Sequence, residues 1–108
     1  MKRGEVWWVQ SDPAVGSEVR KTQSAVIVST DAANRHLTRV VVIPLTSKTT
    51  RLYPAEALVS VGGQTSKAMA DQIMVADKRR LKGRLGHLSI DDMLGVETVI
   101  KLHLGLPQ

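Results

Sequence analysis

The chain has 108 residues, a formal net charge of +5 from 15 Lys and Arg against 10 Asp and Glu, and no cysteine. This length suits one small domain, which we expect to span residues 1–108, and the lack of cysteine excludes disulfides, thiolate zinc sites and cysteine nucleophiles. No apolar run is long enough to cross a membrane and the first residues lack the long apolar centre of a signal peptide, so we expect a cytoplasmic protein without membrane contacts.

The positive charge is concentrated before the last twenty residues. Residues 1–88 contain 14 Lys and Arg against 7 Asp and Glu, whereas residues 89–108 contain one Lys against three acids. The densest basic run is residues 78–84. A field of this sign favours a polyanion as partner. The alternative for such a run is a solvated loop that only keeps the protein soluble.

The first strand is predicted at residues 5–9, which are rich in Trp and Val and precede a turn at Asp12-Pro13. Residues 15–23 show no periodicity and indicate an exposed polar loop. Residues 24–29 are almost wholly apolar and β-branched, which is typical of a strand covered on both faces.

The middle of the chain repeats this alternation of apolar strand and polar loop. Residues 31–34 favour one helical turn, and residues 39–44 predict a second buried strand closed by Pro44. Residues 45–50 form a second polar loop.

Further short strands follow, separated by glycines that favour turns. Gly62-Gly63 predicts a turn after one strand, and Gly83 and Gly86 interrupt the last one. Five or six short strands at this spacing indicate a small barrel or rolled antiparallel sheet. The predicted strands in this half are residues 57–61, 66–75 and 84–88.

The end of the chain predicts an amphipathic helix. Ser89 is a favourable N-cap, and Asp91 and Asp92 in the first turn suit the helix dipole. Apolar residues then recur every three or four positions, at Met93, Val96, Ile100 and Leu104, with Val99 and His103 adjoining this face. We expect this face to pack against the chain's own barrel; the alternative is a separate partner helix.

Two polar loops carry the candidate chemistry. Residues 16–23 offer Glu18, Arg20, Lys21 and Gln23, and residues 44–51 offer Thr46, Ser47 and Lys48. Neighbouring central strands would bring both loops to one end of the barrel. Guanidinium, ammonium, hydroxyl and carboxylate groups together suit gripping a phosphate and stabilising a phosphorane. RNA fits better than DNA because it supplies a nucleophile in its 2′-OH. The alternative is that these residues only close turns and form ion pairs.

Short motifs across nearly the whole chain resemble the MazF/PemK family of toxin endoribonucleases. They stand in the family's order and spacing: Arg3-Gly4-Glu5-Val6-Trp7-Trp8-Val9, Asp12-Pro13, Gly16-Ser17-Glu18, Ala25-Val26-Ile27-Val28-Ser29, Pro44-Leu45-Thr46-Ser47, and Asp71-Gln72 leading to Asp77-Lys78-Arg79-Arg80-Leu81.

The resemblance implies a mostly β fold, a small SH3-like antiparallel barrel with a C-terminal helix, that forms a homodimer. It implies cleavage of single-stranded RNA at short motifs without a metal or other cofactor, leaving a 2′,3′-cyclic phosphate and a 5′-OH. It also implies neutralisation by an acidic cognate antitoxin.

By position, Thr46 matches the family's catalytic threonine and Glu18 matches its acid. The family's catalytic arginine is replaced here by Gln23, which cannot supply the charge that a phosphorane dianion demands. Arg20 or Lys21 is a candidate to reach the phosphate instead. On pKa grounds Glu18 is the better base and an arginine the better electrostatic clamp, while Thr46 orients the phosphate.

The candidate RNA-binding residues extend beyond the catalytic ones. Asp71 and Gln72 resemble a family segment that lines the RNA groove, where they would read base edges; the alternative is that they cap a strand. Tyr53 is a candidate for stacking on a base, or else a half-buried barrel aromatic. The remaining candidates are Lys21, Ser47 and Lys48.

Three hypotheses remain open from the sequence. The leading one is a sequence-selective endoribonuclease toxin. The second is a weakened or inactive protein of the same fold that binds RNA or antitoxin without cutting, as Gln23 permits. The third, a poison of gyrase like CcdB, lacks support because that protein depends on a C-terminal Trp-Gly-Ile, whereas this chain ends Gly105-Leu106-Pro107-Gln108.

Overall fold

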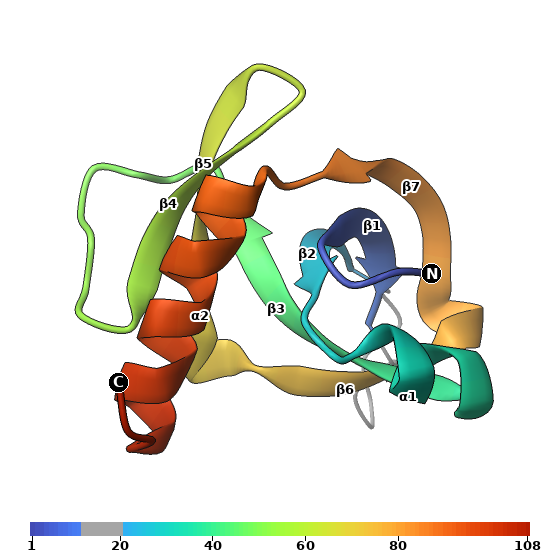
Figure 1. The fold of residues 1–108 in the computed structure, drawn as a ribbon. Coiled ribbons are helices and arrows are strands. Elements are labelled where there is room, and N and C mark those ends of the chain that lie inside the picture. The colour runs from blue at the N-terminus through green and yellow to red at the C-terminus, as the bar shows by residue number, and fades with distance from the viewer. Residues whose placement is uncertain (12–20) are drawn as a thin grey trace, which may run out of the picture.

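The computed structural model describes residues 1–11 and 21–108, and its strands form one curled antiparallel sheet with a long helix lying against it (Figure 1). The strands are β1 (Glu5–Gln10), β2 (Thr22–Ile27), β3 (Arg39–Thr46), β4 (Glu56–Val61), β5 (Gln64–Met69), β6 (Met74–Asp77) and β7 (Leu81–His87). The helices are α1 (Asp31–His36) and α2 (Ile90–Leu104), with 3-10 turns η1 (Ala70–Gln72) and η2 (Lys78–Arg80).

Strand β3 is the centre of the sheet because three strands pair with it. The strand order is β4-β5-β3-β2-β1-β7, and β6 pairs with the first half of β3. The second half of β3 pairs with β5, so the sheet bends along this strand into a half-barrel. The mostly β, barrel-like fold with a C-terminal helix is therefore confirmed.

Helix α2 closes the larger of two apolar cores. The Ser89 hydroxyl accepts a hydrogen bond from the Asp92 N–H at 3.1 Å, so the predicted N-cap is confirmed. Met93, Val96 and Val99 are buried among residues of β1 to β5, which confirms that the helix packs against its own sheet. None of the helices in the described ranges is both long and apolar enough to cross a membrane.

The expected apolar face of α2 is wrong at its last turn. Leu104 is 51% exposed, whereas Val99 takes the third buried position. The sheet therefore covers the helix as far as Ile100, which packs against the larger core, and leaves the last turn in solvent.

The single strand expected at residues 66–75 is wrong. The 3-10 turn η1 divides this segment into β5 and β6. The division follows from a change of partner along β3: Val42 is its last residue paired with β6, and Leu45 is its first residue paired with β5. Pro44, expected to close β3, lies inside the strand opposite Ala25 of β2. Its missing N–H falls in the gap between β5 and β6, where no ladder needs a donor.

Two further strand boundaries differ from the expected ones. Strand β2 begins at Thr22, so Thr22 and Gln23 belong to a strand and not to the polar loop. Strand β7 begins at Leu81 and runs through Gly83 and Gly86, because these glycines lie at register shifts against β1 where the strand bulges without ending.

Candidate functional site

A groove in the sheet is lined by residues of six strands, and its hydroxyl and amide side chains come from β2, β5 and the end of β3. Its volume is about 540 Å³, and we call it the Thr46 groove. The described residues that line it are Val6 and Trp8 of β1, Thr22, Gln23 and Ser24 of β2, Leu45, Thr46 and Ser47 at the end of β3, Val61, Gly62, Gln64 and Ser66 of the β4–β5 hairpin, and Leu85 of β7.

Pairing of β2 with β3 brings two of the predicted catalytic positions into this groove. Gln23 lies near the start of β2, and Thr46 is the last residue of β3. Because the two strands run antiparallel with Ala25 opposite Pro44, the start of β2 lies beside the end of β3. The Gln23 Nε2 donates to the Leu45 carbonyl at 3.4 Å, and the Thr46 Oγ1 accepts from the Lys48 N–H at 3.3 Å. The predicted residues Glu18 and Arg20 lie outside the described residues.

The described lining of the Thr46 groove holds no Lys, Arg, Asp or Glu. Its polar side-chain groups are five hydroxyls, two amides and the indole N–H of Trp8, which form hydrogen bonds without carrying charge. Such groups suit a phosphate oxygen or the edge of a nucleobase. They carry no positive charge, so stabilising a phosphorane in this groove would need a cation from a residue outside its described lining.

Trp8 is a groove residue that the sequence interpretation missed. Its side chain is 42% exposed, whereas Trp7 packs against the smaller core and its Nε1 donates to the Glu5 Oε1 at 3.0 Å. Both tryptophans suit a strand, so composition gave no reason to separate them. The signal was the alternation of a strand, which sends adjacent side chains to opposite faces.

The other predicted RNA-binding residues lie outside the groove lining. Lys21 and Lys48 are exposed beside it, and Asp71 and Gln72 are exposed on η1. Ser47 alone of the predicted RNA-binding set lines the groove.

Tyr53 is held by a buried ion pair. The Lys67 Nζ lies 2.8 Å from the Glu56 Oε1 and 5.2 Å from the centre of the Tyr53 ring, and the Tyr53 N–H donates to the same carboxylate. Burial would raise the pKa of Glu56, but the hydrogen bonds from Lys67 and Tyr53 outweigh it and hold the pKa below its usual range. The Tyr53 side chain itself is 54% exposed.

The basic run at residues 78–84 is largely committed to contacts within the protein. Its side chains join η2 and β7 to neighbouring elements, so charge density in the sequence overstates the free positive surface. Lys78 donates to the Asn34 carbonyl, Arg79 lies 3.0 Å from Asp77, Arg80 donates to the Gln10 carbonyl at 2.7 Å, and Arg84 lies 3.5 Å from Glu5.

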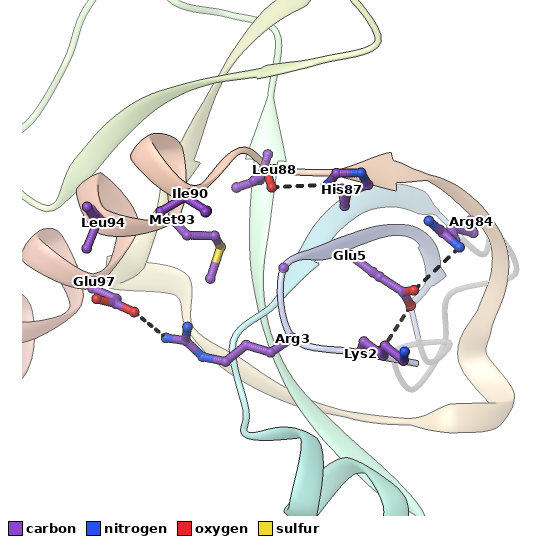
Figure 2. Close-up of a pocket in the computed structure, with 11 residues that line it drawn as sticks. Lys2, Arg3, Glu5, Arg84, His87, Leu88, Ile90, Met93, Leu94 and Glu97 are labelled. Atoms are coloured by element: carbon purple, nitrogen blue, oxygen red, sulfur yellow. Dashed lines mark hydrogen bonds and ion pairs between the residues drawn. The ribbon is translucent and has the colours of Figure 1, made fainter.

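A second groove, of about 570 Å³, lies between the N-terminal residues, the end of β7 and the first half of α2. We call it the N-terminal groove. Figure 2 shows Glu5 between Lys2 and Arg84, and Arg3 reaching toward Glu97 at 3.0 Å. Both of its carboxylates are therefore paired with arginines, while Lys2 contacts Glu5 through its backbone N–H. In residues 1–11 and 21–108, no group of three or more His, Asp or Glu side chains is arranged to hold a metal ion.

Comparison with known proteins decides the family. Residues 2–104 match the model of the PemK-like, MazF-like toxin of type II toxin-antitoxin systems. The chain belongs to the PemK/MazF toxin family. Among PemK/MazF relatives, it is 39% identical to "Endoribonuclease MazF9" of Mycobacterium tuberculosis, over 98% of each chain, and 32% identical to "Endoribonuclease MazF" of Staphylococcus saprophyticus, over 98% of this chain and 92% of that protein.

Solved PemK/MazF structures agree with the fold. A mycobacterial endoribonuclease in complex with its cognate antitoxin superposes with a TM-score of 0.82 at 29% identity, covering 100% of this chain and 98% of that one. The PemK/MazF resemblance stated from the sequence motifs is thus confirmed.

Proposed function

We propose that this PemK/MazF protein is a toxin that cleaves single-stranded RNA, mRNA in particular, at short sequence motifs in the cytoplasm. The observation that carries the proposal is the Thr46 groove, in which Thr46, Ser47 and Gln23 lie together at the meeting of β2 and β3. Relatives named endoribonucleases that match over nearly their whole length support the same activity.

The proposed reaction needs no external nucleophile and no cofactor. The 2′-oxygen of the ribose bonds to phosphorus while the bond from phosphorus to the 5′-oxygen breaks. The 2′-hydroxyl proton passes to a base, and the leaving 5′-oxygen takes up a proton. The products are a 2′,3′-cyclic phosphate and a 5′-OH, and cyclisation of this kind requires the 2′-OH at the cleaved link.

The residues divide these tasks by their chemistry. Thr46, at the end of β3, presents a hydroxyl that orients a phosphate oxygen. Glu18 is proposed from the sequence as the base, since a carboxylate accepts a proton far more readily than an arginine does. Arg20 or Lys21 is proposed to supply the positive charge that the described lining of the groove lacks.

A second candidate function rests on Gln23. This neutral side chain occupies the groove beside Thr46, with its amide 3.4 Å from the Leu45 carbonyl. A groove without a cation still binds RNA or an antitoxin segment through hydrogen bonds, but stabilises a phosphorane weakly. The protein would then bind without cutting.

The proposed partners are an acidic antitoxin and a second copy of the chain. The net charge of +5 favours an acidic, partly disordered antitoxin segment, and a mycobacterial structural neighbour is in complex with its cognate antitoxin. Exposed apolar side chains on α2, including Ile90 and Leu94, favour a homodimer, since burying them would stabilise a small domain.

The test is cleavage of a long mixed-sequence RNA, with the cut sites mapped and the ends analysed. We expect cuts at one short motif, a cyclic phosphate on the upstream fragment, and no cut when the single ribose at that link is replaced by deoxyribose. Cutting that survives the deoxyribose would contradict attack by the 2′-OH. RNA binding without cutting would favour the second candidate function.

A further inference from the structure

One wall of the Thr46 groove is apolar and open to solvent. Trp8 and Leu85 are each 42% exposed, and both line the groove together with Val6 and Val61. An exposed tryptophan beside polar groups is a typical platform for a flat, uncharged ligand.

The strand neighbours of Trp8 explain how its indole is held. Trp8 pairs with Ser24 of β2 and with Gly83 of β7. A Cβ at Gly83 would lie 3.8 Å from the Trp8 Cδ1, so a side chain at this position would touch the edge of the indole, and glycine leaves that edge uncovered. Strand pairing on both sides therefore fixes the backbone of Trp8, and no side chain of residue 83 covers its indole.

The hydrogen-bonding groups of Trp8 and its neighbours are available to a ligand. Among the described residues the Trp8 indole N–H has no protein acceptor, unlike that of Trp7, which donates to Glu5. The amides of Gln23 and Gln64 and the hydroxyls of Ser24 and Ser66 line the same groove. Amide groups donate and accept at once, which is the pattern that the edge of a nucleobase requires.

We infer that the Trp8 wall is a nucleobase subsite, where a base next to the cleaved link stacks on the indole while Gln23 and Gln64 read its edge. This rests on the proposed function, since Thr46 holds the phosphate of the same RNA. The neutral lining favours a base over a second phosphate, because a phosphate would need cations that the described lining does not provide. Any base can stack on an aromatic ring, so the selectivity for one base would come from hydrogen bonds with the amides of Gln23 and Gln64.

The test compares Trp8→Leu with Trp8→Phe on an RNA containing the mapped cut site. Loss of the ring is expected to raise KM by about tenfold or more, whereas Trp8→Phe keeps a ring and stays within about threefold of the parent protein. Trp7→Phe is the matched control, since Trp7 lies outside the groove lining, and its KM is expected to stay unchanged.

Substrates with one abasic nucleotide, placed in turn on either side of the cut, locate the stacked base. At one of these positions the missing base should raise KM for the parent protein but add little for Trp8→Leu, because both changes remove the same contact. An unchanged KM for Trp8→Leu, or an abasic penalty that persists in full in that variant, would overturn the subsite.

A binding measurement tests the nucleobase subsite independently of RNA cleavage. If the parent protein cuts no RNA, the cleavage proposal fails. Titration with a single-stranded oligonucleotide still tests whether a base stacks on Trp8. Quenching of tryptophan fluorescence that Trp8→Phe removes and Trp7→Phe preserves would support the subsite. Binding without that quenching, or no binding at all, would refute it.

Discussion

The two grooves have nearly the same volume, about 540 Å³ and 570 Å³, but opposite chemistry. The described lining of the Thr46 groove is uncharged and polar, and the only hydrogen bonds that its side chains make to other described residues are those of Gln23 and Thr46 to neighbouring backbone groups. The N-terminal groove is rich in charge, yet Glu5 and Glu97 are each already paired with an arginine (Figure 2).

The densest charge therefore does not coincide with the groove that holds Thr46 and Gln23. Arg3, Arg79 and Arg84 form ion pairs with carboxylates, and Lys78 and Arg80 donate to backbone carbonyls. These contacts connect strands, the N-terminal residues and α2. Polar groups that have no partner in the protein are available to a ligand. A group that is already paired within the protein would have to break that pair before it could bind a ligand. By that criterion the neutral groove is the better candidate for a binding surface.

The largest expected effect comes from removing the hydroxyl of the Thr46 groove. Thr46→Val preserves the shape of the side chain but cannot orient a phosphate oxygen, so we expect RNA cleavage to fall about 100-fold in kcat. Thr46→Ser retains the hydroxyl and should keep most of the activity. Thermal unfolding of all three proteins should coincide within a few degrees, because Thr46 lies half exposed at the end of β3. A fully active Thr46→Val protein would remove this hydroxyl from the mechanism.

The opposite effect is expected in the N-terminal groove, where a substitution should change stability and leave cleavage intact. Glu5 is 9% exposed and accepts hydrogen bonds from the Lys2 N–H at 2.9 Å and the Trp7 Nε1 at 3.0 Å. Glu5→Gln removes the charge that strengthens these bonds, so we expect a loss of about 2 kcal/mol in the free energy of unfolding. Glu97→Gln is the control: its pair with Arg3 is half exposed and worth less than about 1 kcal/mol.

Lowering the pH should remove the stability that the charge of Glu5 contributes. Burial would raise the pKa of Glu5, but the hydrogen bonds from Lys2 and Trp7 and the positive charges of the N-terminus and Arg84 together lower it. A lowered pKa in the folded protein stabilises it above the pKa of the unfolded chain, and that stability is lost as the pH falls below about 4 through the lowered value. The stability difference between the parent protein and Glu5→Gln should therefore shrink in acid. A constant difference from pH 7 to pH 3 would contradict the assigned charge effect.

Much of the fold was predictable because its signals are local. The buried strands around Ala25 and Ile43 are nearly continuous β-branched runs, and Ser89 with two following acids begins α2 as expected. The errors at residues 66–75 and at Pro44 share one cause. Both depend on β3 changing partner between Val42 and Leu45, which is a long-range event with no local sequence signal.

The site was predictable in part for the same reason. Thr46 and Gln23 were found through motif order, and their neighbourhood follows from the pairing of β2 with β3. Trp8 was missed because its role depends on Gly83 and Leu85, which lie some seventy-five residues away in the chain and reach β1 only through β7. The partners of the basic run were hidden likewise, since Arg80 binds a backbone carbonyl at Gln10.

The smallest predicted effect sharpens the comparison by giving the neutral groove a charge. Gln23 lies on β2 with its amide already in the groove, so Gln23→Arg places a guanidinium near Thr46 without changing the strand. A fixed cation stabilises the phosphorane, and we expect cleavage to rise about tenfold. Gln23→Lys, a point charge without the planar fork, should gain less, and Gln23→Ala should gain nothing. Separate kcat and KM values for the three variants, measured on one RNA at fixed ionic strength, distinguish charge stabilisation, which raises kcat, from stronger RNA binding, which lowers KM. Equal rates for Gln23→Arg and the parent protein would mean that a cation at position 23 does not limit this reaction. The neutral lining would then serve base recognition, with the catalytic charge supplied from elsewhere.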